Sequence, residues 1–344
     1  SADSVSKSDR DSALKFRRCE KNLLDEHVII IDEASMLDTQ LTASLLKAVR
    51  PGSHVIFIGD SDQLPSVGAG NVLHDLIDSG CLPTVCLTQI FRQAEKSLIV
   101  TNAHAINEGR MPQNGDKNSD FFLMERTTNA ATASTIVDLC IRRLPTAYGP
   151  DVAGKIQVIC PGRRGEGGSE HLNVLLQAAL NPPTKMKKEH KMRDRVFREG
   201  DRVMQIRNNY DLSWSCAGGT DGMGIFNGDI GKILEIDEEA QELLLDFDGR
   251  QVVYPMDMLT DLDHAWAITV HKSQGSEYPI VILSAAQTAP MLQTRNLLYT
   301  AVTRGQKMVI VVGQIAVVEE MVRNNRQVMR YTGLCERLST GDRV

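Results

Sequence analysis

Two acidic residues, Asp32 and Glu33, directly follow an apolar run at residues 28–31. A continuous run of Val and Ile is typical of a strand that is buried on both faces of a parallel sheet. The two acids would then lie at the carboxyl end of that strand, where α/β sheets bind their ligands. In phosphoryl transfer one such carboxylate can hold Mg²⁺ and a second can polarise the attacking water. The alternative is a helix N-terminus whose acids complement the helix dipole, and the dipeptide alone leaves both interpretations open.

A second polar segment, residues 59–70, follows another apolar run at residues 55–58. It contains glycines, which allow the backbone to approach a ligand closely. It also contains Gln63, whose amide could orient a water molecule or contact a γ-phosphate. A plain strand-to-helix loop is the alternative, but that interpretation does not explain why Asp, Gln, Pro and several glycines gather in one short segment.

The elements that would position these segments alternate between strands and helices, which predicts an open parallel sheet covered by helices. Residues 181–195 are rich in Lys, Arg and Pro and are expected to form a linker. Helical periodicity is present at 41–49, 97–107, 131–144 and 169–180, and short apolar strands are expected at 28–31, 55–58, 84–87 and 156–160.

The pattern changes between residues 196 and 261, where short alternating strands are separated by Asn-Gly and Asp-Gly turns. This pattern predicts a small antiparallel barrel, with the glycine-rich stretch 216–224 as a mobile loop. Strands at 281–284 and 308–312 then resume the α/β alternation, so the barrel is expected to be an insertion. The predicted domains are 1–93, then 94–195 together with 262–335, and the barrel at 196–261.

Composition is ordinary for a globular protein, with 42% hydrophobic and 24% charged residues in a chain of 344. No apolar run reaches the roughly 18 residues of a membrane helix, and the N-terminus has no signal-peptide pattern. Seven scattered cysteines without a C-x-x-C pair favour reduced thiols over zinc or disulfide sites, so a cytoplasmic location is expected. The net charge of −6 argues against a general nucleic-acid coat but is compatible with a local basic groove.

The two polar segments read D-E-A-S-M at residues 32–36 and G-D-S-D-Q-L-P-S-V-G at residues 59–68. They resemble motifs II and III of superfamily 1 DNA helicases, and the match is closest to the RecD-like branch. Residues 87–93, 267–277 and 297–305 resemble motifs IV, V and VI, in the family's order. The resemblance implies an α/β protein with two RecA-like parallel-sheet domains, of which the first is incomplete, and a Src-homology-type barrel inserted in the second.

The resemblance also implies catalytic roles for five residues. Asp32 would ligate Mg²⁺, Glu33 would activate the attacking water and Gln63 would sense the γ-phosphate. Arg92 and Arg304 would act as arginine fingers, a role that suits guanidinium because it is planar, always charged and able to bind phosphate through two bonds. A single arginine considered alone is more often part of a surface salt bridge.

Further residues would bind nucleotide and DNA by the same resemblance. Gln89, Gly275 and Glu277 would lie at the edge of the nucleotide, with Glu277 near the ribose. Because only 5% of the residues are aromatic, the strand track is expected to rely on backbone and hydroxyl donors. The family places the barrel beside this track, and an insertion without DNA contacts is the alternative. The candidate DNA-binding residues are Pro65, Ser66, Val67, Asn102, Thr269, His271, Lys272 and Ser273.

The chain contains no segment that matches the P-loop pattern G-x-x-x-x-G-K-[ST]. Residues 149–156 come nearest, but they end in Ile instead of Ser or Thr, and Pro150 removes a backbone amide that phosphate binding would use. The expectation is a fragment that begins inside the first motor domain, binds ATP weakly and does not hydrolyse it at a useful rate alone.

The sequence therefore predicts part of an ATP-dependent helicase that moves on single-stranded DNA with ATP and Mg²⁺ as cofactors. By resemblance it would move 5′ to 3′ and act in repair or recombination, with other recombination or repair subunits as further candidate partners. Two alternatives stay open. One is an ATPase-dead module that binds DNA or a partner, and the other is the helicase part of a conjugative relaxase.

Overall fold

The computed structural model describes residues 16–87, 96–326 and 332–340. The chain divides into two compact units. Unit 1 comprises Ser1–Thr88 and Val328–Val344, and unit 2 comprises Gln89–Gln327. Within the described ranges, no helix combines the length and apolar character that crossing a membrane requires.

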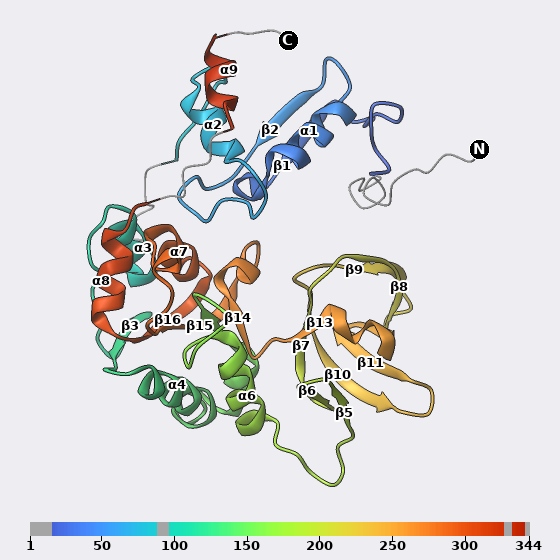
Figure 1. The fold of residues 1–344 in the computed structure, drawn as a ribbon, viewed down its shortest axis with the longest axis vertical. Helices are drawn as coiled ribbons and strands as arrows, with labels where there is room; N and C mark the ends of the chain where they lie inside the picture. The colour runs from blue at the N-terminus through green and yellow to red at the C-terminus, as the bar shows by residue number, and fades with distance from the viewer. Residues whose placement is uncertain (1–15, 88–95, 327–331, 341–344) are drawn as a thin grey trace, which may run out of the picture. The chain divides into compact units, whose positions relative to one another are not determined.

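Unit 1 contains a two-stranded parallel sheet, drawn in blue in Figure 1. The first strand occupies the predicted Val28–Ile31 run and pairs in register with the second, Val28 opposite His54. The Asp38 side chain caps the first helix by accepting a hydrogen bond of 2.7 Å from the Leu41 N–H. The elements of unit 1 are β1 (Val28–Ile31), η2 (Ala34–Met36), α1 (Thr39–Ala48), β2 (His54–Phe57), α2 (Val72–Asp78) and α9 (Leu334–Thr340).

Two predictions for unit 1 are wrong. The strands are not buried on both faces: Ile31 and Phe57 pack against Ala34, Leu37 and Leu73, whereas Ile30 on the opposite face is 62% exposed. The reason is that, among the described residues, apolar packing covers only one side of this sheet. Residues 84–87 do not form a strand either, and Leu87 is 95% exposed.

The C-terminal helix α9 belongs to unit 1, although the predicted second domain extended to residue 335. The Thr332 hydroxyl donates a 2.7 Å hydrogen bond to Asp75 of α2. The Cys81 thiol lies 3.2 Å from the Leu338 carbonyl oxygen. These contacts attach the end of the chain to the first unit.

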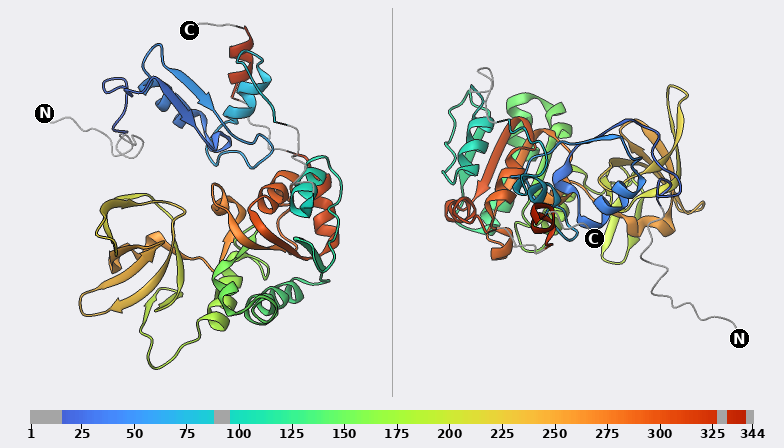
Figure 2. Two further views of the ribbon diagram at one scale, coloured as in Figure 1. Left: turned by 180° about the vertical axis from the view of Figure 1, so that it is seen from behind. Right: turned by 90° about the horizontal axis from the view of Figure 1, so that it is seen from above.

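Unit 2 is built on a five-stranded parallel sheet in the order β14-β4-β15-β16-β3. Helices α4 and α6 share one apolar cluster with alternate residues of β15 and β16. Helices α3, α7 and α8 cover the other face, as Figures 1 and 2 show. The elements are α3 (Leu98–Asn107), β3 (Phe121–Glu125), α4 (Asn129–Asp138), η4 (Leu139–Arg143, a π-helix), α5 (Leu144–Tyr148), η5 (Pro150–Lys155), β4 (Ile156–Cys160), α6 (Ser169–Leu180), β14 (Ala267–Thr269), η7 (Val270–Ser273), β15 (Tyr278–Ala285), η8 (Pro290–Leu292), α7 (Arg295–Val302), β16 (Gly305–Gly313) and α8 (Ile315–Arg323).

The predicted barrel is present as a curled antiparallel sheet inserted between α6 and β14. Its core is formed by large apolar side chains such as Phe247, Tyr254 and Ile233, all fully buried. The strands are β7 (Arg202–Gln205), β8 (Asn209–Cys216), β9 (Asp221–Ile225), β10 (Ile230–Asp237), β11 (Glu242–Phe247), β12 (Arg250–Pro255) and β13 (Leu262–His264), with η6 (Met256–Asp261) before β13 and a separate hairpin of β5 (Glu189–Met192) and β6 (Arg195–Arg198).

Two segments that were predicted to be irregular are ordered here. The expected linker 181–195 contains β5, which pairs with β6. The glycine-rich stretch expected to be a mobile loop contains most of β9, which pairs with β8. A side chain at Gly222 would place its Cβ 2.2 Å from the Trp214 ring, so the glycine lets the indole pack against the strand.

Candidate nucleotide and nucleic-acid sites

The acidic pair follows β1 directly, as predicted. The Asp32 carboxylate is exposed, and its Oδ1 accepts a 2.8 Å hydrogen bond from the Glu33 N–H. Glu33 adopts a left-handed conformation, φ 52° and ψ 40°, and its side chain does not cap the short helix that follows. Glu33 thus stands at the N-terminus of a short helix without capping it through its side chain, and both interpretations of the acidic pair stay predictions.

The loop after β2 packs directly against the acidic pair's loop. The Ala34 N–H donates a 2.8 Å hydrogen bond to the Ile58 carbonyl oxygen. A Cβ at Gly59 would lie 2.9 Å from the Ala34 nitrogen, so only glycine allows this close approach. Gln63 lies in the same loop, where its amide donates to Asp60 at 3.2 Å. Motifs II and III thus form one continuous polar edge of unit 1.

The donor set of this edge fits Mg²⁺, because Asp32 and Glu33 supply the oxygen ligands that a hard cation prefers. Only Oδ1 of the Asp32 carboxylate accepts the Glu33 N–H, so the lone pairs of Oδ2 can ligate a cation. The Ser35 hydroxyl beside the pair is buried and has no hydrogen-bond partner among the described residues. The two carboxylates are the groups that would hold a hydrated cation at the end of β1.

The three candidate DNA residues of unit 1 differ in exposure. Val67 is 84% exposed and Pro65 is half-buried. Ser66 is only 4% exposed, and its hydroxyl lies 3.3 Å from the carbonyl oxygens of Gly68 and Gly70. The Ser66 side chain therefore stabilises its own loop, which leaves Val67 and Pro65 as the surface residues of this segment.

Asn102, another candidate DNA residue, is buried in α3. Its amide donates a 2.8 Å hydrogen bond to the Gln113 carbonyl oxygen, and its own oxygen accepts from the Gln113 N–H at 2.8 Å. Only 2% of the residue is exposed. Both polar groups are already paired with backbone, so this placement does not fit the predicted DNA contact.

The motif V candidates occupy β14 and the short helix η7. Ser273 is fully buried and its hydroxyl donates to the Val270 carbonyl oxygen at 2.8 Å, so its side chain supports the turn. His271 is exposed and Thr269 is half-buried. The Lys272 amino group donates a 3.1 Å hydrogen bond to Asn227 of the barrel, and burial lowers the pKa of this lysine. Lys272 therefore connects motif V with the barrel.

The motif VI arginine, Arg304, is 3% exposed. Its guanidinium donates to the carbonyl oxygens of Thr300 at 3.2 Å and Ser276 at 3.4 Å, and to the Thr303 hydroxyl at 3.3 Å. In this structure Arg304 thus holds the motif V and motif VI backbones together inside unit 2.

The nucleotide-edge candidates of unit 2 lie on the surface. Gly275 has a left-handed φ of 72°, and Glu277 is exposed and accepts a 3.1 Å hydrogen bond from Gln306. The remaining candidates, Gln89 and Arg92, lie outside the described residues.

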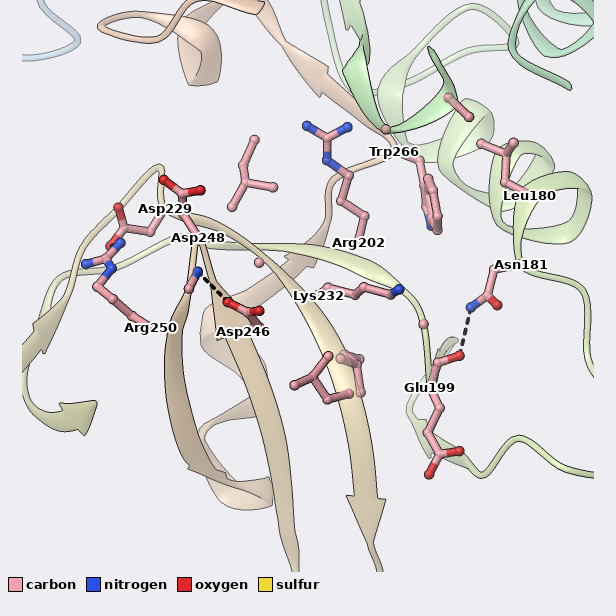
Figure 3. A pocket seen from close by; sticks show the side chains of 18 of the residues that line it. Leu180, Asn181, Glu199, Arg202, Asp229, Lys232, Asp246, Asp248, Arg250 and Trp266 are labelled. Carbon is pink, nitrogen blue, oxygen red and sulfur yellow. Dashed lines mark hydrogen bonds and ion pairs between the residues drawn. The ribbon is translucent and has the colours of Figure 1, made fainter. Parts of the chain in front are cut away.

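A cavity of about 1260 Å³ lies in unit 2 between the barrel and the α/β domain. Figure 3 shows the Trp266 ring pointing into it from the domain side and Lys232 reaching into it from β10. Its acids are largely bonded already: Asp229 pairs with Arg250 at 3.2 Å, and Asp246 accepts from the Gly249 N–H at 2.6 Å. Of the candidate site residues only Glu277 lines it, so the cavity is separate from most of the motif residues.

Sequence reasoning missed a buried polar network that joins the barrel to α6. Asp201 is fully buried and accepts hydrogen bonds from Gln177 at 2.6 Å, Asn181 at 2.8 Å and the Arg198 N–H at 2.8 Å. His264 Nε2 lies 3.3 Å from the same carboxylate. The sequence offered one weak signal, an aspartate next to the Gly200 turn.

Three family models match segments of the chain. Residues 172–247 match the ATP-dependent RecD-like DNA helicase SH3 domain, residues 2–121 match an AAA domain, and residues 264–312 match the UvrD-like helicase C-terminal domain. The first of these coincides with most of the barrel, and the other two with the predicted motor segments on either side.

Curated relatives are similar over most of the chain. An ATP-dependent RecD2 DNA helicase from Deinococcus radiodurans is 36% identical over 311 residues, which are 90% of this chain and 39% of that protein. The RecBCD enzyme subunit RecD from Mycobacterium tuberculosis is 32% identical over 345 residues, covering 95% of this chain and 56% of that protein. The chain thus spans from about two fifths to just over half of the length of these relatives.

A solved structure shares the fold. The Pif1 helicase from Bacteroides in complex with ADP-AlF3 and ssDNA superposes with a TM-score of 0.50 at 19% identity, covering 88% of this chain and 73% of that one. The likeness confirms the α/β architecture with RecA-like sheets that the sequence predicted.

Proposed function

The chain belongs to the RecD-like branch of superfamily 1 helicases, and on this premise we propose that it forms part of an ATP-driven motor on single-stranded DNA. Asp32 is proposed to ligate Mg²⁺, Glu33 to activate the attacking water and Gln63 to sense the γ-phosphate. Arg304 and Arg92 are proposed to stabilise charge on the transferred phosphate. Movement 5′ to 3′ in repair or recombination is part of the same proposal.

The observation that carries the proposal is the hydrogen bond from the Ala34 N–H to the Ile58 carbonyl oxygen. It joins the loop of the acidic pair to the loop of Gln63 with no side chain between them at Gly59. A carboxylate pair and an amide are thereby held along one edge of a parallel sheet, the place where α/β folds bind phosphate ligands. ATP with Mg²⁺ would supply the phosphoryl group and its counter-charge there.

Single-stranded DNA is proposed as the partner of the exposed residues Val67 and His271 and of the half-buried residues Pro65, Thr269 and Lys272. The relative from Mycobacterium tuberculosis is a RecBCD subunit, so further recombination subunits are candidate partners of the protein that contains this chain. The exposed apolar face around Ile30 is a candidate contact surface for such a subunit or for a further part of the motor.

The test supplies the missing phosphate-binding motif. A segment with the P-loop pattern G-x-x-x-x-G-K-[ST] is joined in front of this chain, and phosphate release is measured with and without oligothymidine. We expect release to rise with DNA, and Glu33→Gln to abolish turnover while nucleotide binding persists. The 344 residues alone should release no phosphate above background, because they contain no P-loop pattern.

Two results would contradict the proposal. One is a near-normal rate in the Glu33→Gln variant of the joined protein. The other is the absence of any single-strand binding by the chain at low salt, measured by fluorescence anisotropy. A folding check by circular dichroism accompanies each variant, so that loss of structure is distinguished from loss of chemistry.

A further inference from the structure

Two aromatic rings are exposed side by side on the barrel. Tyr210 of β8 and Phe226, which directly follows β9, have ring centroids 5.5 Å apart in an edge-to-face arrangement of 70°. Tyr210 is 61% exposed and Phe226 is 40% exposed. Aromatic side chains normally bury most of their area, so an exposed pair brought together from two separate segments indicates a surface that contacts something else.

The backbone fixes the position of the Phe226 ring. Gly224 has a φ of 99°, and a Cβ there would lie 2.7 Å from Phe226 Cζ, so the ring packs over a residue that must be glycine. The Phe226 N–H donates a 2.9 Å hydrogen bond to Asp229, which also pairs with Arg250 at 3.2 Å. The ring is therefore held in place without a ligand, and the carboxylate nearest to it in sequence is neutralised.

Hydrogen bonds join this pair to motif V. The residue after Phe226 is Asn227, whose side-chain oxygen accepts from the Lys272 amino group at 3.1 Å. The Asn227 N–H in turn donates to the Asn208 side chain at 2.9 Å, and the Asn208 amide lies 3.5 Å from the Tyr210 hydroxyl. Lys272 and the two rings thus form one continuous polar and aromatic surface across the barrel and the α/β domain of unit 2.

We propose that Tyr210 and Phe226 form a stacking surface for one base of single-stranded DNA, an inference that rests on the function proposed above. A single strand offers unpaired base faces that stack on aromatic rings regardless of sequence. In a duplex both faces of each base are already covered. Lys272 adds the positive charge that a phosphate backbone requires; burial lowers the pKa of this lysine, and the charge of Asp263 acts in the opposite direction.

In this arrangement Lys272 and Asn227 are positioning residues for the rings. The hydrogen bond between them fixes the turn at Phe226 relative to the motif V helix η7. Movement of motif V would then carry the stacking surface with it.

The test measures binding of the 344-residue chain to a fluorescent oligothymidine of about 16 nucleotides, near the upper site size of small single-strand binding folds. Replacing both rings, Tyr210→Ala with Phe226→Ala, should weaken binding about 5- to 100-fold. The dependence of affinity on salt should stay the same, because no phosphate contact is removed. Tyr148→Ala, which removes a 56% exposed ring on α5, is the matched control and should leave affinity unchanged.

An abasic scan identifies stacking directly. One abasic position in the oligonucleotide should weaken wild-type binding by about the same factor as removal of the rings. The same abasic position should have no further effect on the double variant. Asn227→Ala should weaken binding in the wild type and add nothing in the double variant, since it acts through the rings.

The outcomes separate the two proposals. Undiminished binding by a folded double variant, checked by the tryptophan emission of unit 2, overturns the stacking surface and leaves the proposed function intact. An equal loss of duplex binding also overturns the stacking surface, because duplex bases have no free face. Absence of single-strand binding by the wild-type chain at low salt overturns both.

Discussion

The Glu33 N–H donates a 2.8 Å hydrogen bond to the Asp32 carboxylate, while Glu33 itself is held at φ 52°, ψ 40°. A residue with a Cβ is disfavoured in this left-handed region by roughly 1–2 kcal/mol. Such strain persists where the surrounding structure holds it, and it is concentrated at functional sites. Here Glu33 is the N-cap residue of the short helix that follows, and its carboxylate makes no capping hydrogen bond.

Glu33→Gly should therefore raise the stability of unit 1 by about 1 kcal/mol, because glycine adopts positive φ without cost. The measurement is hydrogen exchange of the β1 and β2 amides, which should slow about fivefold. Arg193→Gly is the matched control, since Arg193 has φ 57° in the β5–β6 hairpin of unit 2. It should leave exchange in β1 unchanged. Faster exchange in the Glu33→Gly variant would contradict the inference that the Glu33 backbone is strained.

Arg304 should contribute to stability as well as to turnover. Arg304→Ala removes a buried guanidinium together with its hydrogen bonds to the Thr300 and Ser276 carbonyl oxygens, so we expect unit 2 to lose about 2–3 kcal/mol. Urea unfolding followed by tryptophan emission measures this loss, because both tryptophans, Trp214 and Trp266, lie in unit 2. Arg323→Ala, in an exposed pair with Glu319, should cost less than about 0.5 kcal/mol. Equal losses in the two variants would contradict the packing role.

We expect Asp201 to be essential for the stability of the interface between the barrel and α6. Asp201→Ala removes a fully buried carboxylate that accepts from the Gln177 and Asn181 amides, which then keep only their bonds to the Val196 and Glu199 carbonyl oxygens. We expect a loss of about 3 kcal/mol in unit 2, measured by the same urea transition. Asp201→Asn should cost less, because the amide oxygen still accepts. If both variants unfolded at the wild-type urea concentration, the network would not support the interface.

Because the protein contains buried thiols, we expect its free energy of unfolding to fall at alkaline pH. Burial raises the pKa of Cys140 to about 12, from an ordinary value near 9. Above pH 9 the unfolded thiol loses its proton while the folded one keeps it, so unfolding releases a proton and stability falls as pH rises toward 12. The slope is at most about 1.4 kcal/mol per pH unit for this group, and Cys140→Ala should reduce it between pH 9 and 10.5.

Thiol labelling tests the burial of Cys140 independently of the urea or pH measurements. At pH 8 the exposed Cys19 and Cys81 should react within minutes, whereas Cys140 should react only after unfolding. Rapid labelling of Cys140 in the folded chain, located by peptide mass mapping, would contradict its burial.

Local sequence information predicted a large part of the fold. The strands at 28–31 and 156–160 and the helix at 169–180 were correct to the residue. Runs of β-branched residues and helical periodicity act over a few positions, so they are visible without the fold. The strand expected at 84–87 is not formed, and within the described part of the chain this segment pairs with no strand.

The candidate site also has a part that the sequence predicted and a part that it did not. The sequence placed Asp32, Glu33 and Gln63 at the ends of two strands, and the structure has them there. It could not show that Asn102 is paired with the Gln113 backbone, because that pairing depends on the loop folding back over α3. The contact between the Tyr210 and Phe226 rings could not be predicted either, because the Gly224 turn and strand pairing bring the two rings together.

The sequence by itself determined the family, the order of the motifs and the alternation of strands and helices, because these depend on residue identity and short spacing. The tertiary structure decided which polar groups remain exposed. Ser66, Asn102, Ser273 and Arg304 are all bonded inside the protein, and Lys272 is bonded to Asn227, 45 residues away in the chain. Buried polar groups must find partners, and those partners are set by packing between distant segments.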